Sequence, residues 1–433
     1  MTPGAKLAAA IEVFSDIAAR RRPAADTLKD WGLGHRFAGS GDRAGIAGLV
    51  YDALRRRASA AWIMGDDTPR AVLLGALKRE RGLDAEAIAR LADGAGYAPA
   101  ALTEAERARL GAASFEGAPS HVIGDYPEWL DAQFARAFGD ERAEEGAALA
   151  SRAPLDLRVN TLKGEREAAA EELADLAPEP TRWSPNGLRL KLKADAKSPA
   201  IHAEPTFIKG LIEIQDEGSQ LAALLAAGKP GEQVIDLCAG GGGKTLALAA
   251  AMENKGQIFA TDDDKRRLAP IHARLERAGV RNVQVRTPRT SSDVLLDLAE
   301  RMDLVLIDAP CTGIGTWRRN PDAKWRLRPG AIEQRCKEQI EVLEKAAWLV
   351  KPGGRIAYVT CSLFSEENGD QVRAFLGRHG DFSLQNPAEI ANALGERAFL
   401  FRRAVLTTEE GLLMTPRRTD TDGFFVSMLR RNG

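Results

Sequence analysis

The strongest constraint on the fold is an alternation of short apolar runs with helical stretches, which begins near residue 230. Runs rich in Val, Ile and Leu predict strands at 234–237, 257–261, 283–285, 303–307, 355–360 and 424–429. Helical patterns separate most of these runs, so we expect residues 226–433 to form an α/β domain with a parallel, doubly wound, Rossmann-like sheet. Ligands bind such sheets beyond the carboxyl ends of the strands, and the residues that follow each run are therefore the candidate site.

The first predicted strand leads into a glycine loop that opens a helix. The loop consists of Cys238, Ala239, Gly240, Gly241, Gly242, Gly243 and Lys244. Successive glycines let the backbone turn tightly and approach a ligand closely. A phosphate-binding P-loop would need glycine where Cys238 stands, and a GxGxxG dinucleotide pattern would need one where Thr245 stands. We therefore expect a loop for a nucleoside cofactor of another kind.

An acidic residue follows the second predicted strand. Asp262 comes directly after the run 257–261, where a carboxylate can accept both ribose hydroxyls of an adenosine. Asp263 and Asp264 are interpreted as acidic residues at the start of a helix that continues through Lys265. A glycine loop and an acid about twenty residues later suit either NAD or S-adenosylmethionine.

Two further strands end in cysteines. Asp308-Ala309-Pro310-Cys311 follows the run 303–307, and Cys361 follows the run 355–360. Both would lie at the same sheet edge as the glycine loop. Of the other cysteines, Cys238 belongs to that loop. Cys336 falls on an apolar helical stripe that predicts a core position; the stripe is formed by Ile332, Cys336, Ile340, Leu343 and Ala347.

A pocket with two thiols suits methyl transfer to carbon 5 of cytosine, which is itself a poor nucleophile. A thiolate that adds to ring carbon 6 turns the ring into an enamine that can accept a methyl group at carbon 5. Asp308 is placed to stabilise charge at ring nitrogen 3, and a second cysteine can assist removal of the carbon-5 proton. This chemistry favours S-adenosylmethionine over NAD, but strand-end position alone does not rank the two cysteines.

The remainder of the chain consists of two regions with different sequence patterns. Residues 1–145 are rich in Ala and Arg with helical periodicity and predict an all-α domain, with a short helix at 128–138. Residues 150–225 predict a small α+β module with strands at 155–159, 188–192 and 211–214 and a helix at 165–176. Ser219 is the expected N-cap of the next helix.

Composition narrows the class of protein and its partners. The 433 residues carry a net charge of −1, so only local clusters could attract nucleic acid; arginines gather at 20–22, 55–57, 318–319 and 417–418. No apolar run of about 18 residues predicts a membrane span, and the start of the chain does not read as a secretory signal. Four cysteines without CxxC pairs argue against a zinc site or a disulfide framework. We expect a cytoplasmic, metal-free monomer.

Four motifs resemble those of the RsmB/Sun-type RNA cytosine-5 methyltransferases. They are DLCAGGGGKT (236–245), DAPCTGIGTWRRNPDAKW (308–325), TCSLFSEEN (360–368) and DGFF (422–425), and LRVNTLK (157–163) and IQDEGSQ (214–220) also look like that family. The presence of both DAPC and TCS distinguishes this family from the DNA cytosine methyltransferases, which use the cysteine that follows the proline. The resemblance covers about residues 150–430 and implies a class I methyltransferase domain. It further implies S-adenosylmethionine as cofactor, Cys361 as nucleophile and Cys311 as the releasing residue, with residues 238–244, Asp262 and Asp308 lining the cofactor site.

The chain departs from the family pattern in two places. The loop reads CAGGGG where the family commonly has CAAPGG, and the third predicted strand leads to Arg286-Thr287-Pro288-Arg289 where the family usually has an acid for the adenine amino group. The first acid after that strand is Asp293.

The N-terminal region resembles a NusB-like RNA-binding domain, which implies small-subunit ribosomal RNA as substrate with the target base flipped out. Arg318, Arg319, Lys324 and Trp325 would then supply phosphate and stacking contacts beside the pocket. The alternative functions are a transfer RNA cytosine-5 methyltransferase and a catalytically weak RNA-binding ribosome assembly factor.

Overall fold

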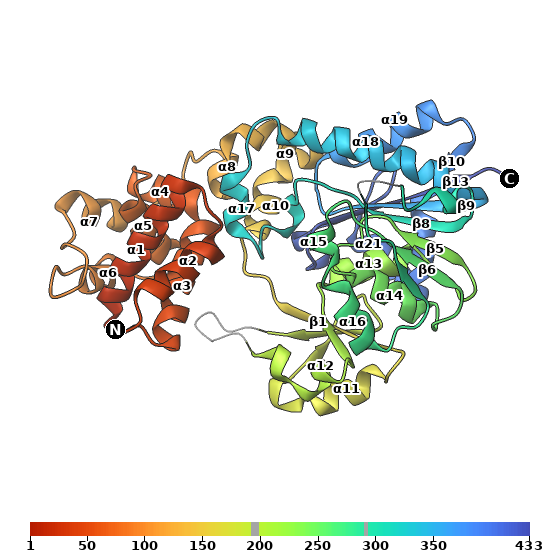
Figure 1. The fold of residues 1–433 in the computed structure, drawn as a ribbon. Coiled ribbons are helices and arrows are strands. Elements are labelled where there is room, and N and C mark those ends of the chain that lie inside the picture. Colours follow the sequence, from red (N-terminus) through yellow and green to blue (C-terminus); the bar gives the residue numbers. More distant parts are fainter. Residues whose placement is uncertain (192–198, 290–292) are drawn as a thin grey trace. The chain divides into compact units, whose positions relative to one another are not determined.

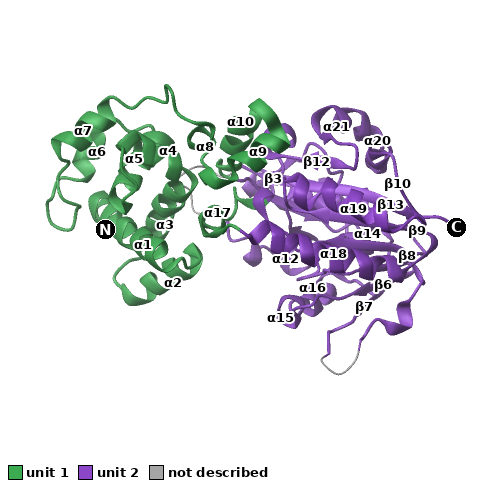
Figure 2. Ribbon diagram, turned by 90° about the horizontal axis from the view of Figure 1, so that it is seen from above, with its two compact units in different colours: residues 1–152, 193–197, 316–329 green, residues 153–192, 198–315, 330–433 purple. Residues whose placement is uncertain are grey.

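The computed structural model describes residues 1–191, 199–289 and 293–433. These residues form two compact units (Figure 2). Unit 1 contains residues 1–152 and 316–329; unit 2 contains residues 153–191, 199–289, 293–315 and 330–433. Leu192, the last residue of the strand predicted at 188–192, lies outside the described residues.

Unit 1 is helical, as predicted for the N-terminal region. Thr2 and Thr68 cap α1 and α5 through their hydroxyl groups, and each is followed by a proline that starts the helix. The apolar faces of these helices meet in one buried core that includes Phe14, Val50 and Leu74. The helices are α1 (Pro3–Arg20), α2 (Ala24–Gly34), α3 (Ser40–Arg55), α4 (Arg57–Met64), α5 (Pro69–Arg81), α6 (Ala85–Leu91), α7 (Glu104–Gly111), α8 (Ser120–Ile123), α9 (Asp131–Phe138), α10 (Arg142–Leu149) and α17 (Pro321–Arg326).

One helix of unit 1 comes from far along the chain. In Figure 1, α17 (cyan) lies with α8 and α10, whose orange and yellow mark a much earlier part of the sequence. Its Trp325 donates from Nε1 to the carbonyl oxygen of Leu54 at 2.7 Å, and its Asp322 accepts from the backbone N–H of Ala24 at 3.2 Å. Residues 316–329 therefore belong to the helical unit, although they follow Cys311 in the sequence.

Unit 2 begins with a four-stranded antiparallel sheet of order β2-β3-β1-β4. Its elements are β1 (Leu155–Val159), α11 (Arg166–Glu172), β2 (Glu179–Pro180), β3 (Gly187–Leu190), α12 (Pro205–Ile208) and β4 (Ile212–Ile214). The predicted N-cap of the next helix is wrong: α13 (Glu217–Leu225) begins two residues before Ser219, and the carboxylate of Asp216 caps it by accepting the N–H of Gly218 at 2.7 Å.

The second sheet of unit 2 has the order β11-β12-β13-β9-β8-β5-β6-β7, with β10 also paired to β13. Strands β5 to β9 pair in parallel, as predicted. Strands β10 to β13 pair antiparallel with their neighbours, so the sheet is mixed. Its strands are β5 (Gln233–Asp236), β6 (Gln257–Ala260), β7 (Val283–Val285), β8 (Met302–Asp308), β9 (Val350–Thr360), β10 (Phe382–Leu384), β11 (Leu406–Thr407), β12 (Leu412–Met414) and β13 (Phe424–Arg431).

Helices cover both faces of this sheet. Figure 1 shows α18 (Ala331–Leu349) and α19 (Gly369–Arg378) on one side of the strands, with α13 and α14 (Gly243–Ala251) on the other. On the α13 and α14 side, Val234, Leu306 and Val359 join one buried cluster. The remaining helices are α15 (Lys265–Leu268), α16 (Ile271–Ala278), α20 (Pro387–Ile390), α21 (Ala398–Ala404) and α22 (Pro416–Thr419).

The stripe predicted on α18 is only partly correct. Ile332, Leu343 and Ala347 are buried, but Ile340 is exposed and Cys336 is half-buried. The buried face instead includes Gln339, whose amide donates to the carbonyl oxygen of Pro310 at 2.9 Å. The buried face thus includes a polar contact with the loop of Cys311, which an apolar pattern does not reveal.

Candidate active site

The two predicted cysteines lie side by side at the carboxyl ends of adjacent parallel strands. Asp308 of β8 pairs with Val359 of β9, which brings the turns after the two strands together. Ala309 donates its N–H to the carbonyl oxygen of Val359, and Gly315 donates to that of Cys361, both at 2.8 Å. The sulfur atoms of Cys311 and Cys361 are 3.3 Å apart, and both residues are half-buried and free of disulfides.

The environment distinguishes the two thiols. The pKa of Cys311 lies well above its usual value, first because of its hydrogen bond with Cys361 and then because of burial; the charge of Cys361 and the nearby Glu367 act in the same direction. Cys311 therefore keeps its proton and can donate it to the sulfur of Cys361.

A lysine–aspartate pair lies in the same pocket. Lys244 Nζ contacts Asp308 Oδ2 at 2.7 Å and lies 5.0 Å from the centre of the Phe424 ring. Burial acts to lower the pKa of Lys244, but the negative charges of Asp308 and Cys361 act to raise it, and the pKa is raised as a result. The buried ammonium thus stays charged and places a positive charge beside Asp308 and Cys361.

Glu367 connects the two cysteine loops, although the predicted site does not include it. Its carboxylate accepts the backbone N–H of Thr312 at 2.8 Å and the Thr312 hydroxyl at 2.5 Å. It also accepts the Ser362 hydroxyl and, at 3.3 Å, the amide of Gln339. The only sequence signal is its place in the TCSLFSEEN motif, because its partners lie up to 55 residues away. Glu367 therefore links Thr312, next to Cys311, to Ser362, next to Cys361.

The glycine loop lies next to this pair and has the conformation that its sequence demands. Gly242 caps α14 at φ +83°, and a Cβ atom there would lie 2.5 Å from Cγ1 of Ile271. Asp262 is buried, with one carboxylate oxygen accepting the N–H of Gly240 and the other that of Asp264, both at 2.9 Å. Asp262 therefore shapes the loop, while Asp264 caps α15 as expected.

A buried acceptor at the tip of β5 fits a cofactor in this position. Asp236 is fully buried; its Oδ2 accepts the hydroxyl of Thr245 at 2.7 Å, while its Oδ1 has no hydrogen-bond partner within the described ranges. Burial raises the pKa of Asp236 to about 7. Cys238, Gly241 and Gly243 remain half-buried on the open side of the loop. The loop thus offers backbone donors beside an incompletely satisfied acid, a set that suits the amino and carboxylate groups of S-adenosylmethionine.

The segment after β7 differs from the family pattern as its sequence indicates. Arg286 directly follows β7; it forms an ion pair with Asp297 at 2.8 Å, and its guanidinium lies 5.2 Å from the centre of the Phe259 ring. Asp293 is exposed and accepts the N–H of Leu295 at 2.9 Å, which stabilises a local turn. An arginine and its acidic partner occupy this end of the sheet edge.

The residues predicted to contact RNA beside the pocket belong to the helical unit. Arg318, Arg319, Lys324 and Trp325 are all part of unit 1. Arg318 and Lys324 are each 1% exposed, and Lys324 donates from Nζ to the carbonyl oxygens of Arg55, at 3.1 Å, and Asp125. The prediction of phosphate and stacking contacts is wrong for these two cations, because both are buried in the helical unit.

Fold and site together define a class I, S-adenosylmethionine-dependent methyltransferase whose pocket contains two cysteines. Residues 223–430 match the family described as 16S rRNA methyltransferase RsmB/F, and residues 126–197 match a ferredoxin-like domain of RsmF/B-like methyltransferases. No helix in the described ranges has the length and apolar character needed to cross a membrane.

Individual proteins and a solved structure support the same assignment. The chain is 33% identical over 309 residues to a probable ribosomal RNA small subunit methyltransferase B of Synechocystis sp., covering 71% of this chain and 67% of that protein. It is 32% identical over 318 residues to the corresponding probable enzyme of Bacillus subtilis, covering 71% of this chain and 67% of that protein. The crystal structure of PH0851 aligns with a TM-score of 0.70 at 26% identity, over 100% of this chain and 99% of that one. The chain belongs to the RsmB/F family of S-adenosylmethionine-dependent RNA cytosine-5 methyltransferases.

Proposed function

We propose that this protein methylates carbon 5 of a cytidine in 16S ribosomal RNA through a covalent adduct with Cys361. The observation that carries the proposal is the 3.3 Å contact between Cys361 and the protonated Cys311. The ribosomal RNA substrate is supported by the family, described as 16S rRNA methyltransferase RsmB/F, and by relatives that are probable ribosomal RNA small subunit methyltransferases. Residues 238–244 and Asp262 would hold S-adenosylmethionine, which supplies the electrophilic methyl group when bound.

The reaction begins at Cys361. Its thiolate, favoured by the ammonium of Lys244 and the S–H of Cys311, forms a bond to carbon 6 of a flipped-out cytosine. Electron density moves onto ring nitrogen 3, which takes up a proton; Asp308, paired with Lys244 at 2.7 Å, would pass that proton from the Lys244 ammonium to the nitrogen. Carbon 5 is then nucleophilic enough to accept the methyl group.

Release requires loss of the carbon-5 proton. Once the sulfur of Cys361 is bonded to carbon, its hydrogen bond with Cys311 is lost. That hydrogen bond is the largest cause of the raised pKa of Cys311. Cys311, which is half-buried, can then lose its proton to solvent, and its thiolate takes the carbon-5 proton. The electrons of that C–H bond re-form the ring double bond, the S–C6 bond breaks, and the thiolate of Cys361 is restored.

Alanine variants test the two roles separately. With a 16S rRNA transcript and tritiated S-adenosylmethionine, Cys361→Ala should incorporate no label, because no adduct forms. Cys311→Ala should accumulate an RNA–protein band that survives denaturing electrophoresis, because methylated RNA cannot leave. The half-buried Cys336, outside the pair, provides the control: Cys336→Ala should resemble the wild type in both assays.

Two results of the same assay would contradict the proposal. Labelling by Cys361→Ala at the wild-type rate would show that another group attacks the base. Labelling of transfer RNA but not of 16S rRNA by the wild-type protein would refute the ribosomal substrate while leaving the cysteine chemistry intact.

A further inference from the structure

The first arginine triplet of unit 1 leaves one guanidinium unpaired. Arg20 forms an ion pair with Asp16 at 2.7 Å, and Arg22 pairs with Asp30 at 2.6 Å. Arg21, between them, is the C-cap residue of α1 in the left-handed region at φ +51°. Across residues 1–191, 199–289 and 293–433, no acid or carbonyl group pairs with its guanidinium.

The second arginine triplet, residues 55–57, also leaves one guanidinium unpaired. Arg55 is buried and donates to the carbonyl oxygen of Arg318 at 3.4 Å, and Arg56 forms an ion pair with Glu80 at 2.6 Å. Arg57 has neither a hydrogen bond nor an ion pair among the described residues; its guanidinium is half-buried over the Trp325 ring, 5.3 Å from the ring centre. Burial lowers the pKa of Arg57, but an arginine remains charged at neutral pH.

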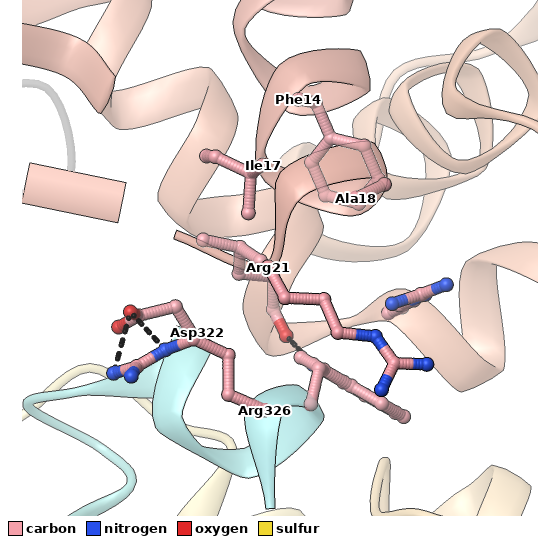
Figure 3. A pocket seen from close by; sticks show the side chains of 9 residues that line it. Phe14, Ile17, Ala18, Arg21, Asp322 and Arg326 are labelled. Atoms are coloured by element: carbon pink, nitrogen blue, oxygen red, sulfur yellow. Dashed lines mark hydrogen bonds and ion pairs between the residues drawn. The ribbon is translucent and has the colours of Figure 1, made fainter. Parts of the chain in front are cut away.

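These two free arginines line the same cavity, which has a volume of about 210 Å³. Figure 3 shows its apolar wall, formed by Phe14, Ile17 and Ala18, opposite the polar side chains. The acid in the lining, Asp322, is occupied, because it forms an ion pair with Arg326 at 3.1 Å. In Figure 3 the side chain of Arg21 extends away from that pair, so its charge is not neutralised there.

We propose that this cavity binds a backbone phosphate of the RNA substrate between Arg21 and Arg57. Guanidinium groups match the geometry of phosphate oxygens, and stacking on Trp325 fixes Arg57 before a ligand arrives. The volume lies below the range of about 300 Å³ upward typical of cofactor pockets, which favours a single phosphate over a larger ligand. A net charge of −1 gives the chain no general attraction for RNA, so such local sites must supply it. The identity of the ligand as RNA rests on the proposed function.

The salt dependence of RNA binding tests the site directly. The double variant Arg21→Gln/Arg57→Gln should bind a 16S rRNA transcript about tenfold more weakly at low salt. The slope of log affinity against log salt should fall by about 0.7 to 0.9, the contribution of one phosphate contact. The control is Arg36→Gln/Arg90→Gln, which removes two exposed arginines of unit 1 that do not line the cavity and should leave both values unchanged. Thermal unfolding and S-adenosylmethionine binding by calorimetry should be the same for all three proteins.

Each outcome bears on the cavity separately from catalysis. A wild-type slope and affinity in the Arg21/Arg57 variant would overturn the proposal, even if the enzyme methylates 16S rRNA. Titration with inorganic phosphate distinguishes the source of the ligand: binding of free phosphate to the wild type, with unchanged RNA binding by the variant, would refute the RNA assignment. If the variant loses a phosphate contact but the wild-type protein does not methylate this RNA, the cavity stands and the proposed function fails.

Discussion

Asp236 illustrates how position controls the chemistry of a single residue. It lies at the end of β5, fully buried, and among the described residues only the hydroxyl of Thr245 donates to its carboxylate. Its pKa is therefore raised to about 7, because burial disfavours the charged form and the neighbouring Asp308 adds to this. The folded protein keeps a proton on Asp236 that the unfolded chain loses near pH ~4.

This difference predicts a pH-dependent stability. Between about pH 4 and pH 7 the folded state binds the extra proton, so the contribution of Asp236 to stability falls as the pH rises through this window. Asp236→Asn stays neutral and can still accept the Thr245 hydroxyl. The free energy of unfolding of the variant, relative to wild type, should increase by about 2 kcal/mol between about pH 5 and pH 8, as measured by urea denaturation. Asp263→Asn, at an exposed position, should show no such change; an equal difference at both pH values for Asp236→Asn would contradict the buried proton.

The site residues that can be predicted from sequence are those that directly follow strands. Cys311 and Cys361 are expected at one sheet edge with the glycine loop, and the structure places them in contact. Glu367 cannot be assigned a role from sequence, because its function depends on donors from Thr312 and Gln339, which approach only after folding. The same limit affects Lys324, whose sequence neighbours suggest RNA contacts but whose acceptors lie in the helical unit.

At the scale of elements, strand positions are predictable but their directions are only partly so. Parallel strands β5 to β9 follow from the alternation with helices, within a few residues at most ends. The antiparallel strands β10 to β12 are short and lack a clear pattern, and the pairing of β13 with β9 depends on contacts that are distant in sequence. Helix starts also depend on caps: Asp216, rather than Ser219, provides the acceptor for α13.

The turn from β5 to α14 requires glycine at position 242, and this requirement can be tested. Gly242→Ala would combine a positive φ of +83° with a Cβ atom 2.5 Å from Ile271. Gly353→Ala is a matched control, because Gly353 has φ +75° but a Cβ atom there would meet nothing within 4 Å, so only the backbone strain remains. The control should lose about 1 kcal/mol of stability, and Gly242→Ala should lose more and also bind S-adenosylmethionine more weakly by calorimetry. Equal stability losses with unchanged cofactor affinity would show that the loop adjusts without cost to the site.

At the scale of the whole molecule, the chain passes directly from the loop of Cys311 into the helical unit. Gly315 belongs to the loop of Cys311, and the next residues, 316–329, belong to unit 1 before the chain returns at α18. Trp317 and Arg318 in this segment are each 1% exposed, so the helical core depends on residues from a motif of the catalytic domain. Composition can separate a helical region from an α/β region, but it cannot reveal that a segment of the second completes the first.

Lys324 anchors this segment and should be essential to the stability of unit 1. Its ammonium donates to the carbonyl oxygens of Arg55 and Asp125, while burial lowers its pKa to about 7 and the carboxylate of Asp125 opposes that shift. Lys324→Met keeps the length of the side chain but leaves two buried acceptors without this donor and removes a positive charge near buried Asp125. We expect a loss of about 3 kcal/mol, measured by urea denaturation and tryptophan fluorescence, whereas Lys29→Met, at an exposed position of α2, should change little. An unchanged or higher stability for Lys324→Met would mean that apolar packing around Trp317 and Trp325, rather than the buried ammonium, holds the segment in the helical unit.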